Sequence, residues 1–216
     1  MSNYFLITTS LEETWNTDKK IFFLGEWCKQ IHRKAFWNKL NSKTQTYHWN
    51  NREKLKKDYN YSKSLYNNLI SELTKNLNFY HKVNYSSRYW KIVLGPWLLS
   101  FIQVVLERYE NIEQLEGDEN EYETIILKID KNILLPTDYE MYSRLIMSDT
   151  WNHFIFSEII KNLKNQRKIS FKEKEFKDRE NFRGYLKIKH YSKIRKIYSL
   201  FTSIFKKKIK KEKFLI

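Results

Sequence analysis

Short apolar runs separated by polar segments dominate the first fifty residues of the chain. Residues 4–8 and 21–24 are two such runs, and each ends at polar residues or at glycine, which is typical of buried strands in a parallel sheet. We predict a third strand at residues 44–49, after a helical stretch at about residues 27–40. This order of elements predicts an α/β fold with a small parallel sheet.

A long amphipathic helix is the clearest element of the middle of the chain. Between residues 52 and 80, apolar and aromatic side chains recur every three or four positions, which is the period of one helical face. Proline is favoured in a first helical turn, so Gly95 and Pro96 predict the start of a second helix that ends near Leu115. The apolar run at residues 92–106 is shorter than a bilayer requires, and we interpret it as a buried helix.

The next part of the chain predicts one further strand and two helices. Residues 124–129 are largely apolar and follow an acidic loop, which indicates a strand. Periodicity predicts helices at residues 138–145 and 149–163, with Thr137 and Ser148 as their N-caps.

The last fifty residues are polar and then amphipathic. Residues 164–183 show little apolar periodicity and indicate a linker or a mobile loop. From Tyr191 to Ile209, apolar side chains again follow at spacings of three and four, which predicts a basic amphipathic helix. We therefore divide the chain into a domain at residues 1–163 and a basic linker and helix at residues 164–216.

Charge is concentrated in this tail. Residues 161–216 hold 20 of the 40 lysines and arginines but 5 of the 25 acidic residues, so their net charge of +15 equals that of the whole chain. This asymmetry places any anionic partner at the tail, although a solvated basic helix without a partner has the same pattern. We expect peripheral contact with an anionic membrane through residues 185–213, and no sequence-specific binding of nucleic acid.

Cysteine usage and the N-terminus indicate a reducing compartment. Cys28 is the single cysteine, so no intramolecular disulfide forms, and no cysteine and histidine cluster has the spacing of a zinc site. We therefore expect no metal. The first residues lack the basic and apolar regions of a signal peptide, which predicts a cytoplasmic protein, with the tail placing it on the inner face of the cytoplasmic membrane.

Candidate chemistry follows the predicted strands, because ligands of open α/β sheets bind outside the carboxyl ends of the strands. A carboxylate or imidazole there can take a proton from a hydroxyl, and arginine can hold an anionic group. Tryptophan presents a flat face to the apolar side of a sugar ring. The residues at these ends are Thr8, Thr9, Glu12 and Glu13 after the first strand, Gly25, Glu26 and Trp27 after the second, and His48, Trp49 and Arg52 after the third.

Several of these residues, and Arg88 before the predicted second helix, also have a purely structural interpretation. Glu12 and Glu13 suit exposed or helix-capping positions, His48 suits a buried structural histidine, and Arg88 suits a surface ion pair. The sequence holds no Walker loop, G-x-G-x-x-G, G-x-S-x-G or H-E-x-x-H motif, which argues against the commonest nucleotide-binding and hydrolytic sites.

Four segments in order, residues 4–15, 23–28, 47–54 and 88–97, resemble the N-terminal part of a family of bacterial transferases for O-antigen and other surface carbohydrate. The resemblance implies a GT-B-like glycosyltransferase of two Rossmann-like halves. The acceptor side lies in the N-terminal half and the nucleotide-sugar side in the C-terminal half. On this view the chain is a helix-rich first half, truncated before the donor half and incomplete for catalysis alone.

If the resemblance holds, the position of these residues at strand ends and their chemistry, and not the family pattern, predict their roles. Glu26 or His48 is the expected base that deprotonates an acceptor hydroxyl, and Arg52 and Arg88 are expected to hold a phosphate or a sugar acid. The expected partner is a carbohydrate or a lipid-linked carbohydrate acceptor. No cofactor is expected in this chain, and a nucleotide-sugar donor is expected only with the missing half.

The alternative function is a non-enzymatic basic helical module that docks on anionic membrane or nucleic acid. Geometry separates the two hypotheses, because the transferase site requires Thr8, Glu26, His48 and Arg88 to lie together.

Overall fold

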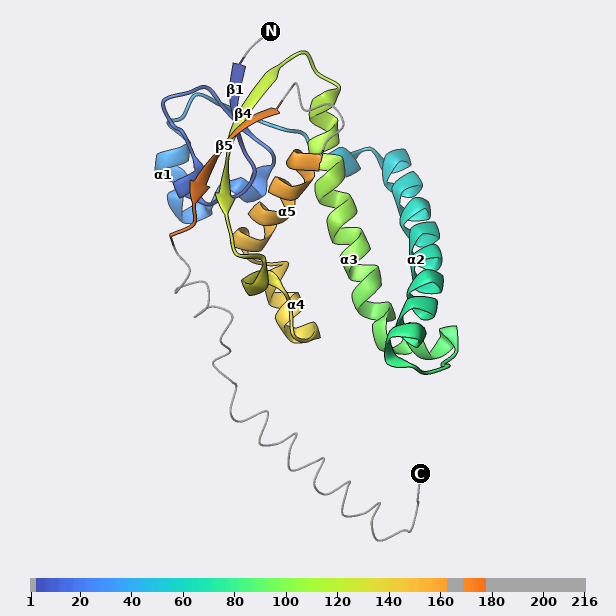
Figure 1. Cartoon of the computed structure of the whole chain (residues 1–216). Coiled ribbons are helices and arrows are strands. Elements are labelled where there is room, and N and C mark those ends of the chain that lie inside the picture. Colours follow the sequence, from blue (N-terminus) through green and yellow to red (C-terminus); the bar gives the residue numbers. More distant parts are fainter. Residues whose placement is uncertain (1–2, 163–168, 178–216) are drawn as a thin grey trace. The chain divides into compact units, whose positions relative to one another are not determined.

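The computed structural model describes residues 3–162 and 169–177, which belong to one compact unit. Its described strands form one parallel sheet in the order β3-β2-β1-β4-β5, of which Figure 1 labels β1, β4 and β5. The strands are β1 (Asn3–Ile7), β2 (Ile21–Phe23), β3 (Ser42–Thr44), β4 (Glu121–Lys128) and β5 (Ile169–Glu175). The chain extends the sheet outward from β1 on both sides, so the strand order reverses between β1 and β4. The predicted α/β fold with a small parallel sheet is confirmed.

Strand β1 is the centre of the hydrophobic core. Its residues Tyr4, Phe5, Leu6 and Ile7 are each no more than 2% exposed, as expected for a parallel strand covered on both faces. The end of α3 and one face of α5 pack against the sheet through Ile112, Leu115, Phe156 and Ile160.

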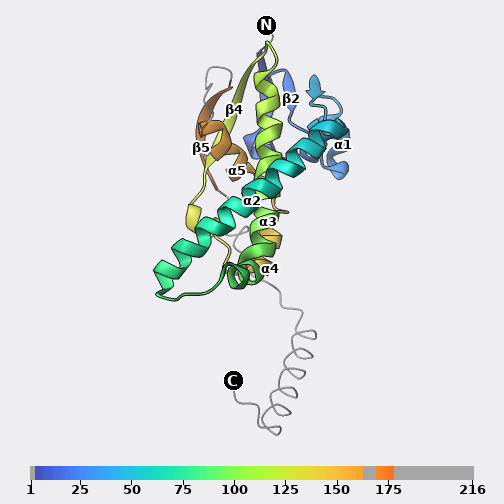
Figure 2. The same ribbon diagram turned by 90° about the vertical axis from the view of Figure 1, so that its right-hand side faces the viewer.

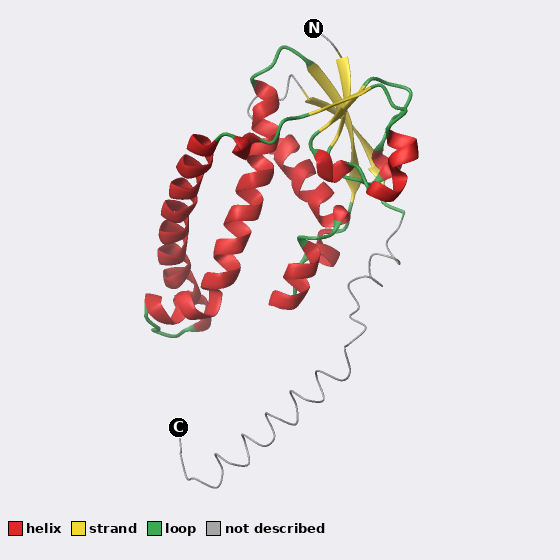
Figure 3. Ribbon diagram, turned by 180° about the vertical axis from the view of Figure 1, so that it is seen from behind, coloured by secondary structure: helices red, strands yellow, loops and turns green. Residues whose placement is uncertain are grey.

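Two helices of 30 residues each, α2 (Arg52–His81) and α3 (Ser87–Glu116), form a hairpin that leaves the sheet (Figures 1 and 3). Figure 2 shows that α2 crosses α3 at an angle. A second, smaller core of Ile70, Leu98 and Ile102 joins them. The predicted helix at residues 52–80 is confirmed, and Asn51 caps it by accepting hydrogen bonds from the N–H groups of Glu53 and Lys54.

The remaining helices are short. They are α1 (Lys34–Trp37), α4 (Tyr139–Leu145) and α5 (Asp149–Asn162). The predictions of helices at residues 138–145 and 149–163 are confirmed, and Ser148 caps α5 through a bond from the N–H of Trp151. The cap of α4 is Asp138 and not Thr137, because the Asp138 carboxylate accepts from the N–H of Met141 at 2.8 Å.

The predictions for residues 27–49 are wrong in detail. In place of one helix, the chain forms 3-10 turns at Glu26–Cys28 and Ile31–Arg33 and then α1. The indole of Trp37 donates to the carbonyl of Gln30, which folds the segment back on itself. The third strand ends at Thr44, and His48–Asn50 is another 3-10 turn, η4.

Helix α3 does not begin at Gly95 and Pro96. It begins at Ser87, where Ser86 accepts from the N–H of Tyr89, and Pro96 lies inside the helix. Gly95 is buried against α2, since a Cβ there would lie 2.7 Å from the hydroxyl of Tyr66. The helix is also not buried as a whole, because 22% of its most apolar window is covered.

The segment expected to be a linker contains a strand. Residues 169–175 form β5, which pairs with β4 along its whole length. Of these seven side chains, that of Ile169 is buried and the others are exposed. An edge strand with charged, solvated side chains lacks an apolar period, which explains why the sequence pattern missed it. Strand β4 likewise begins earlier than predicted, at Glu121. The predicted helix at residues 191–209 and the predicted membrane contact at residues 185–213 lie outside the described residues.

Pro96 provides a test of the observed start of α3. Replacing it with alanine restores an N–H inside the helix and removes the clash of the proline ring with the preceding turn. We expect Pro96→Ala to raise the free energy of unfolding by about 1 to 3 kcal/mol, measured by urea denaturation. A decrease would show that the packing of α2 against α3 requires the proline.

Candidate functional site

The carboxyl end of β1 is covered by two tryptophans. Trp27 donates its indole N–H to the carbonyl of Thr8 at 2.9 Å, and Trp15 donates to the carbonyl of Thr9 at 3.1 Å. Thr8 and Thr9 are 3% and 0% exposed. These indoles satisfy backbone groups that the sheet leaves unpaired, and they place Trp27 parallel to Phe156 of α5 with ring centres 6.4 Å apart.

Gly25 is required here by the closeness of Trp27 and not by a turn. Its φ of −177° is extended, a conformation open to any residue. A Cβ on Gly25, however, would overlap the indole of Trp27. The glycine therefore lets the ring lie flat over the strand ends.

His153 of α5 reaches the point where the strand order reverses. The backbone N–H of Leu127 in β4 donates to its Nε2 at 3.1 Å, so Nδ1 carries the proton of the neutral ring and faces the Thr8 hydroxyl at 3.4 Å. Burial lowers the pKa of His153 to about 4. The imidazole is a neutral link between β1 and β4. The sequence analysis did not select it, although its place near the start of a helix beside a tryptophan was visible.

Asp149, in the first turn of α5, completes this cluster. Its carboxylate accepts from the hydroxyl of Ser10 at 2.6 Å and from the Ser10 N–H at 3.3 Å. The amide of Gln30 donates to the same hydroxyl at 2.5 Å. The strand ends are therefore tied together by their own hydrogen bonds, and the hydroxyl of Thr9 is buried with no partner among the described residues.

Two of the predicted carboxylates at this edge, Glu12 and Glu26, form ion pairs at the surface. Glu12 forms a two-bond ion pair with Arg33 at 2.7 and 2.8 Å, which lowers the pKa of Glu12. Glu26 pairs with Lys29 at 2.9 Å, and its side chain is 78% exposed. Glu13 contributes its backbone carbonyl to the ammonium of Lys174 at 2.6 Å.

The predicted residues do not form one crevice. Thr8, Thr9, Gly25 and Trp27 come together at the strand ends, whereas His48, Trp49 and Arg52 lie at the start of the helical hairpin. Arg88 is in the first turn of α3, at the end of the hairpin away from the sheet (Figure 1). The geometric condition set for the transferase site, that Thr8, Glu26, His48 and Arg88 lie together, is therefore not met.

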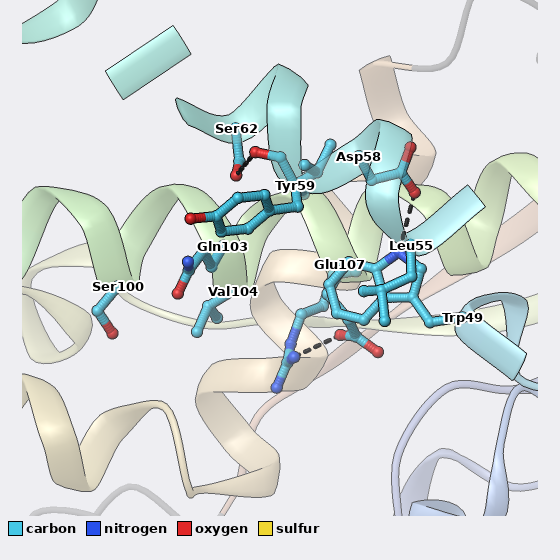
Figure 4. A pocket seen from close by; sticks show the side chains of 11 residues that line it. Trp49, Leu55, Asp58, Tyr59, Ser62, Ser100, Gln103, Val104 and Glu107 are labelled. Atoms are coloured by element: carbon cyan, nitrogen blue, oxygen red, sulfur yellow. Dashed lines mark hydrogen bonds and ion pairs between the residues drawn. The ribbon is translucent and has the colours of Figure 1, made fainter. Parts of the chain in front are cut away.

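A hollow of about 390 Å³ opens instead between η4, α2 and α3, and we name it the helix cavity. Figure 4 shows residues of η4 and α2 facing residues of α3 across it. Its polar and aromatic lining consists of Trp49, Asp58, Tyr59, Ser62, Ser100, Gln103, Glu107 and Arg108.

Two carboxylates are held in the helix cavity by bonds that fix their orientation. Asp58 accepts from the indole of Trp49 at 2.9 Å and pairs with Lys54 at 3.2 Å. Glu107 pairs with Arg108. The side chains of Asp58 and Glu107 are 11% and 12% exposed. Both retain lone pairs that can accept hydrogen bonds from hydroxyl groups.

Arg108 connects the helix cavity to α5. Its Nε and Nη2 donate to the side-chain oxygen of Asn152 at 3.1 and 2.9 Å. Asn152 precedes His153, so neighbouring residues of α5 contact the helix cavity and the strand ends. The two polar clusters are therefore positioned by one helix.

His48 lies on the other side of η4 and lines a second hollow of about 560 Å³ with Lys54 and Glu113. Asn111 donates its amide to Glu107, so its oxygen accepts the proton of His48 Nδ1 at 3.2 Å. Nε2 then carries the lone pair, and it is buried without a partner among the described residues. Burial, as the largest effect, lowers the pKa of His48, which favours the neutral ring.

Comparisons with known proteins identify a family and nothing further. A family model described as LIC12162 family transferase matches residues 4–216. A comparison with curated proteins and one with solved structures each gave no match. The predicted transferase family is confirmed, whereas the O-antigen role and the individual site residues stay predictions.

The buried His153 gives the domain a pH dependence. The unfolded chain protonates it near pH 6.5 and the folded chain near pH 4. Between these values the unfolded state binds more protons, so the stability present above pH 6.5 is lost as the pH falls toward 4, by about 3 kcal/mol in total.

Urea denaturation of the parent and of His153→Gln at several pH values measures this loss. Glutamine can still accept from Leu127 and donate to Thr8 but does not titrate, so we expect a weaker dependence on pH in the variant. The buried His48 contributes in the same direction in both proteins. Equal slopes for the two proteins would contradict the assignment to His153.

Replacement of Gly25 by alanine tests the cover over the strand ends. The new Cβ displaces the indole of Trp27, so we expect a loss of about 1 to 3 kcal/mol of stability and a red shift of tryptophan emission. Gly117→Ala is the control, because a Cβ there makes an ordinary contact at 3.5 Å with the carbonyl of Gln114. If both variants unfold at the same urea concentration, the close contact between Gly25 and the indole of Trp27 is not important for stability.

Proposed function

Since the chain belongs to the LIC12162 family transferases, we propose that the described domain binds the acceptor in a glycosyl transfer of bacterial surface-carbohydrate synthesis. The helix cavity is the acceptor site in this proposal. The observation that carries it is the combination of aromatic faces with two oriented carboxylates in one hollow.

The chemistry of the helix cavity suits a sugar. The rings of Trp49 and Tyr59 offer flat apolar faces, and Asp58 and Glu107 offer acceptors for hydroxyl groups. Its volume of about 390 Å³ lies within the range of small-molecule sites. An acceptor bound there has its hydroxyls oriented by fixed groups, which is how a protein lowers the entropic cost of a two-substrate reaction.

Glycosyl transfer requires a base as well as a binding site. The acceptor oxygen forms a bond to the anomeric carbon, the bond from that carbon to the nucleotide diphosphate breaks, and the proton of the acceptor hydroxyl passes to the base. Neither base expected from the sequence lines the helix cavity, because His48 lines the second hollow with a buried Nε2 and Glu26 is exposed beside Lys29. The base in this proposal is therefore one of the two carboxylates of the helix cavity, Asp58 or Glu107.

The nucleotide-sugar donor is assigned to a second Rossmann-like half of a GT-B-like enzyme. The sequence contains no glycine-rich phosphate-binding motif, and the strand ends, where such a donor would bind in an open sheet, are closed by the bonds of Trp27, His153 and Asp149.

Saturation-transfer NMR with the full chain tests the acceptor site. The probes are methyl glycosides of hexoses, N-acetylhexosamines and deoxyhexoses. We expect at least one to bind, and Tyr59→Ala to weaken its binding about two- to tenfold, since stacking on one ring contributes about 0.5 to 1.5 kcal/mol. Tyr61→Ala is the matched control, because Tyr61 has the same exposure of 57% on the same helix and lines a different hollow.

Two results would overturn the proposal. One is that no glycoside binds specifically, so that none gives a saturation-transfer signal that decreases when a competing glycoside is added. The other is that Tyr59→Ala and Tyr61→Ala bind the same glycoside equally well, which would place the sugar outside the helix cavity.

A further inference from the structure

The end of the α2–α3 hairpin carries large apolar side chains that the described protein leaves uncovered. We name residues 75–93 the hairpin tip, and it lies at the end of the hairpin away from the sheet (Figures 1 and 3). Phe79 and Tyr80 are 88% and 79% exposed, and Ile92 is 71% exposed. The other exposed members are Tyr85, Tyr89 and Val93. Apolar side chains gathered in this way mark an interaction surface.

The hairpin tip has a defined conformation. The side chain of Asn78 donates to the carbonyl of Tyr85 at 2.9 Å and accepts from its N–H at 3.2 Å and from the indole of Trp90 at 2.8 Å. Trp90, which belongs to the hairpin tip, is itself buried, with 7% of its surface exposed. Tyr85 and Tyr89 contact each other with ring centres 4.2 Å apart. The exposed aromatic side chains are therefore presented by a built turn and not by a frayed helix end.

The charge of the hairpin tip has one sign. Residues 73–106 contain no aspartate or glutamate, whereas acidic residues occur on both sides of this stretch. The four cations within it, Lys75, Lys82, Arg88 and Lys91, are all exposed. This pattern fits an anionic partner.

Lys82, one of these four cations, ends helix α2. It has a φ of 54°, in the left-handed region, where glycine is favoured because it has no Cβ. Its N–H and that of Val83 close the end of α2 on the carbonyls of Phe79 and Asn78. A lysine thus occupies a position that the backbone alone would give to glycine.

The apolar character of α3 points in the same direction. Within the described residues, α3 is one helix that is long and apolar enough to cross a bilayer by length and composition. Buried helices of soluble proteins pass the same test, so this does not establish a membrane span. In this protein Leu98 and Ile102 are packed against Ile70 of α2, which leaves the first turns of α3 as the exposed apolar part.

We propose that the hairpin tip is a docking surface for an anionic lipid bilayer. Phe79 and Tyr80 enter the headgroup region, where aromatic side chains are favoured, and the lysines and Arg88 contact lipid phosphates. A second copy of the chain is a poorer occupant, because two tips in contact would bring the four cations of each together. An anionic bilayer removes the apolar side chains from water and also offers phosphate groups to the cations.

Vesicle binding of the full chain tests this surface. The probes are sonicated vesicles of phosphatidylcholine with and without phosphatidylglycerol. We expect binding to the anionic vesicles and a loss of about tenfold or more in Phe79→Ser with Tyr80→Ser, because two aromatic side chains no longer leave water. The control is Tyr61→Ser with Tyr109→Ser, which removes two exposed aromatic side chains of α2 and α3 outside the hairpin tip.

A second measurement separates the hairpin tip from the basic tail. The described cysteine, Cys28, is buried, so a polarity-sensitive dye can be attached selectively to a new cysteine in Phe79→Cys or, as a control, in Tyr61→Cys. We expect a blue shift of dye emission on anionic vesicles at position 79 and none at position 61.

Three outcomes would overturn the proposal. In the first, the chain binds vesicles while the dye at position 79 stays in water, which assigns binding to the tail. In the second, the dye emission shifts to the blue as the protein concentration rises in the absence of lipid, which assigns the hairpin tip to a protein interface. In the third, the Phe79 and Tyr80 double variant binds as the parent does.

Discussion

The polar groups that follow the buried strand β1 impose the constraint on which the domain depends. Residues 4–7 are covered on both faces, and the chain then continues with Thr8, Thr9 and Ser10, all buried. A buried polar group left without a partner costs about 1 to 3 kcal/mol. The partners come from far along the chain, since His153 and Asp149 of α5 lie 145 and 139 residues from Thr8 and Ser10. Satisfying these groups fixes α5 against the sheet.

This constraint also decides where open sites remain. Because indoles, an imidazole and a carboxylate already occupy the strand ends, the helix cavity and the hollow beside His48 lie at the base of the hairpin. Both depend on the same fixed helix, because Asn152 of α5 holds Arg108, which in turn pairs with Glu107. The location of ligand sites in open α/β sheets is a good rule for the fold, yet here the strand ends have become part of the core.

Local pattern was sufficient for some elements and not for others. Strands β1 and β2 and helix α2 follow from apolar runs and from a helical period because burial determines both the pattern and the structure. Strand β5 was invisible because six of its seven side chains are solvated. Pro96 misled the prediction of the start of α3, because the helix is capped by Ser86 and tolerates proline in its interior.

The candidate sites were harder to predict than the fold for a related reason. The bond between His48 and Asn111 joins residues 63 positions apart, and a single sequence does not encode such pairings in its local pattern. The sequence did identify Gly25, Trp27, His48 and Trp49 as special positions. It did not show that Gly25 and Trp27 form one cluster, or that His48 and Trp49 lie on opposite sides of η4.

The geometry of the hairpin links the two proposals made for it. Tyr59 of the helix cavity and Phe79 of the hairpin tip are 20 residues apart on α2, and a helix rises about 1.5 Å per residue, so they are separated by about 30 Å along its axis. If the hairpin stands upright on a bilayer, a lipid-linked acceptor reaches the helix cavity through an extended carbohydrate chain. If the hairpin lies along the surface, a short acceptor reaches it directly. The tilt of α2 on the membrane therefore determines the length of acceptor that the helix cavity can bind.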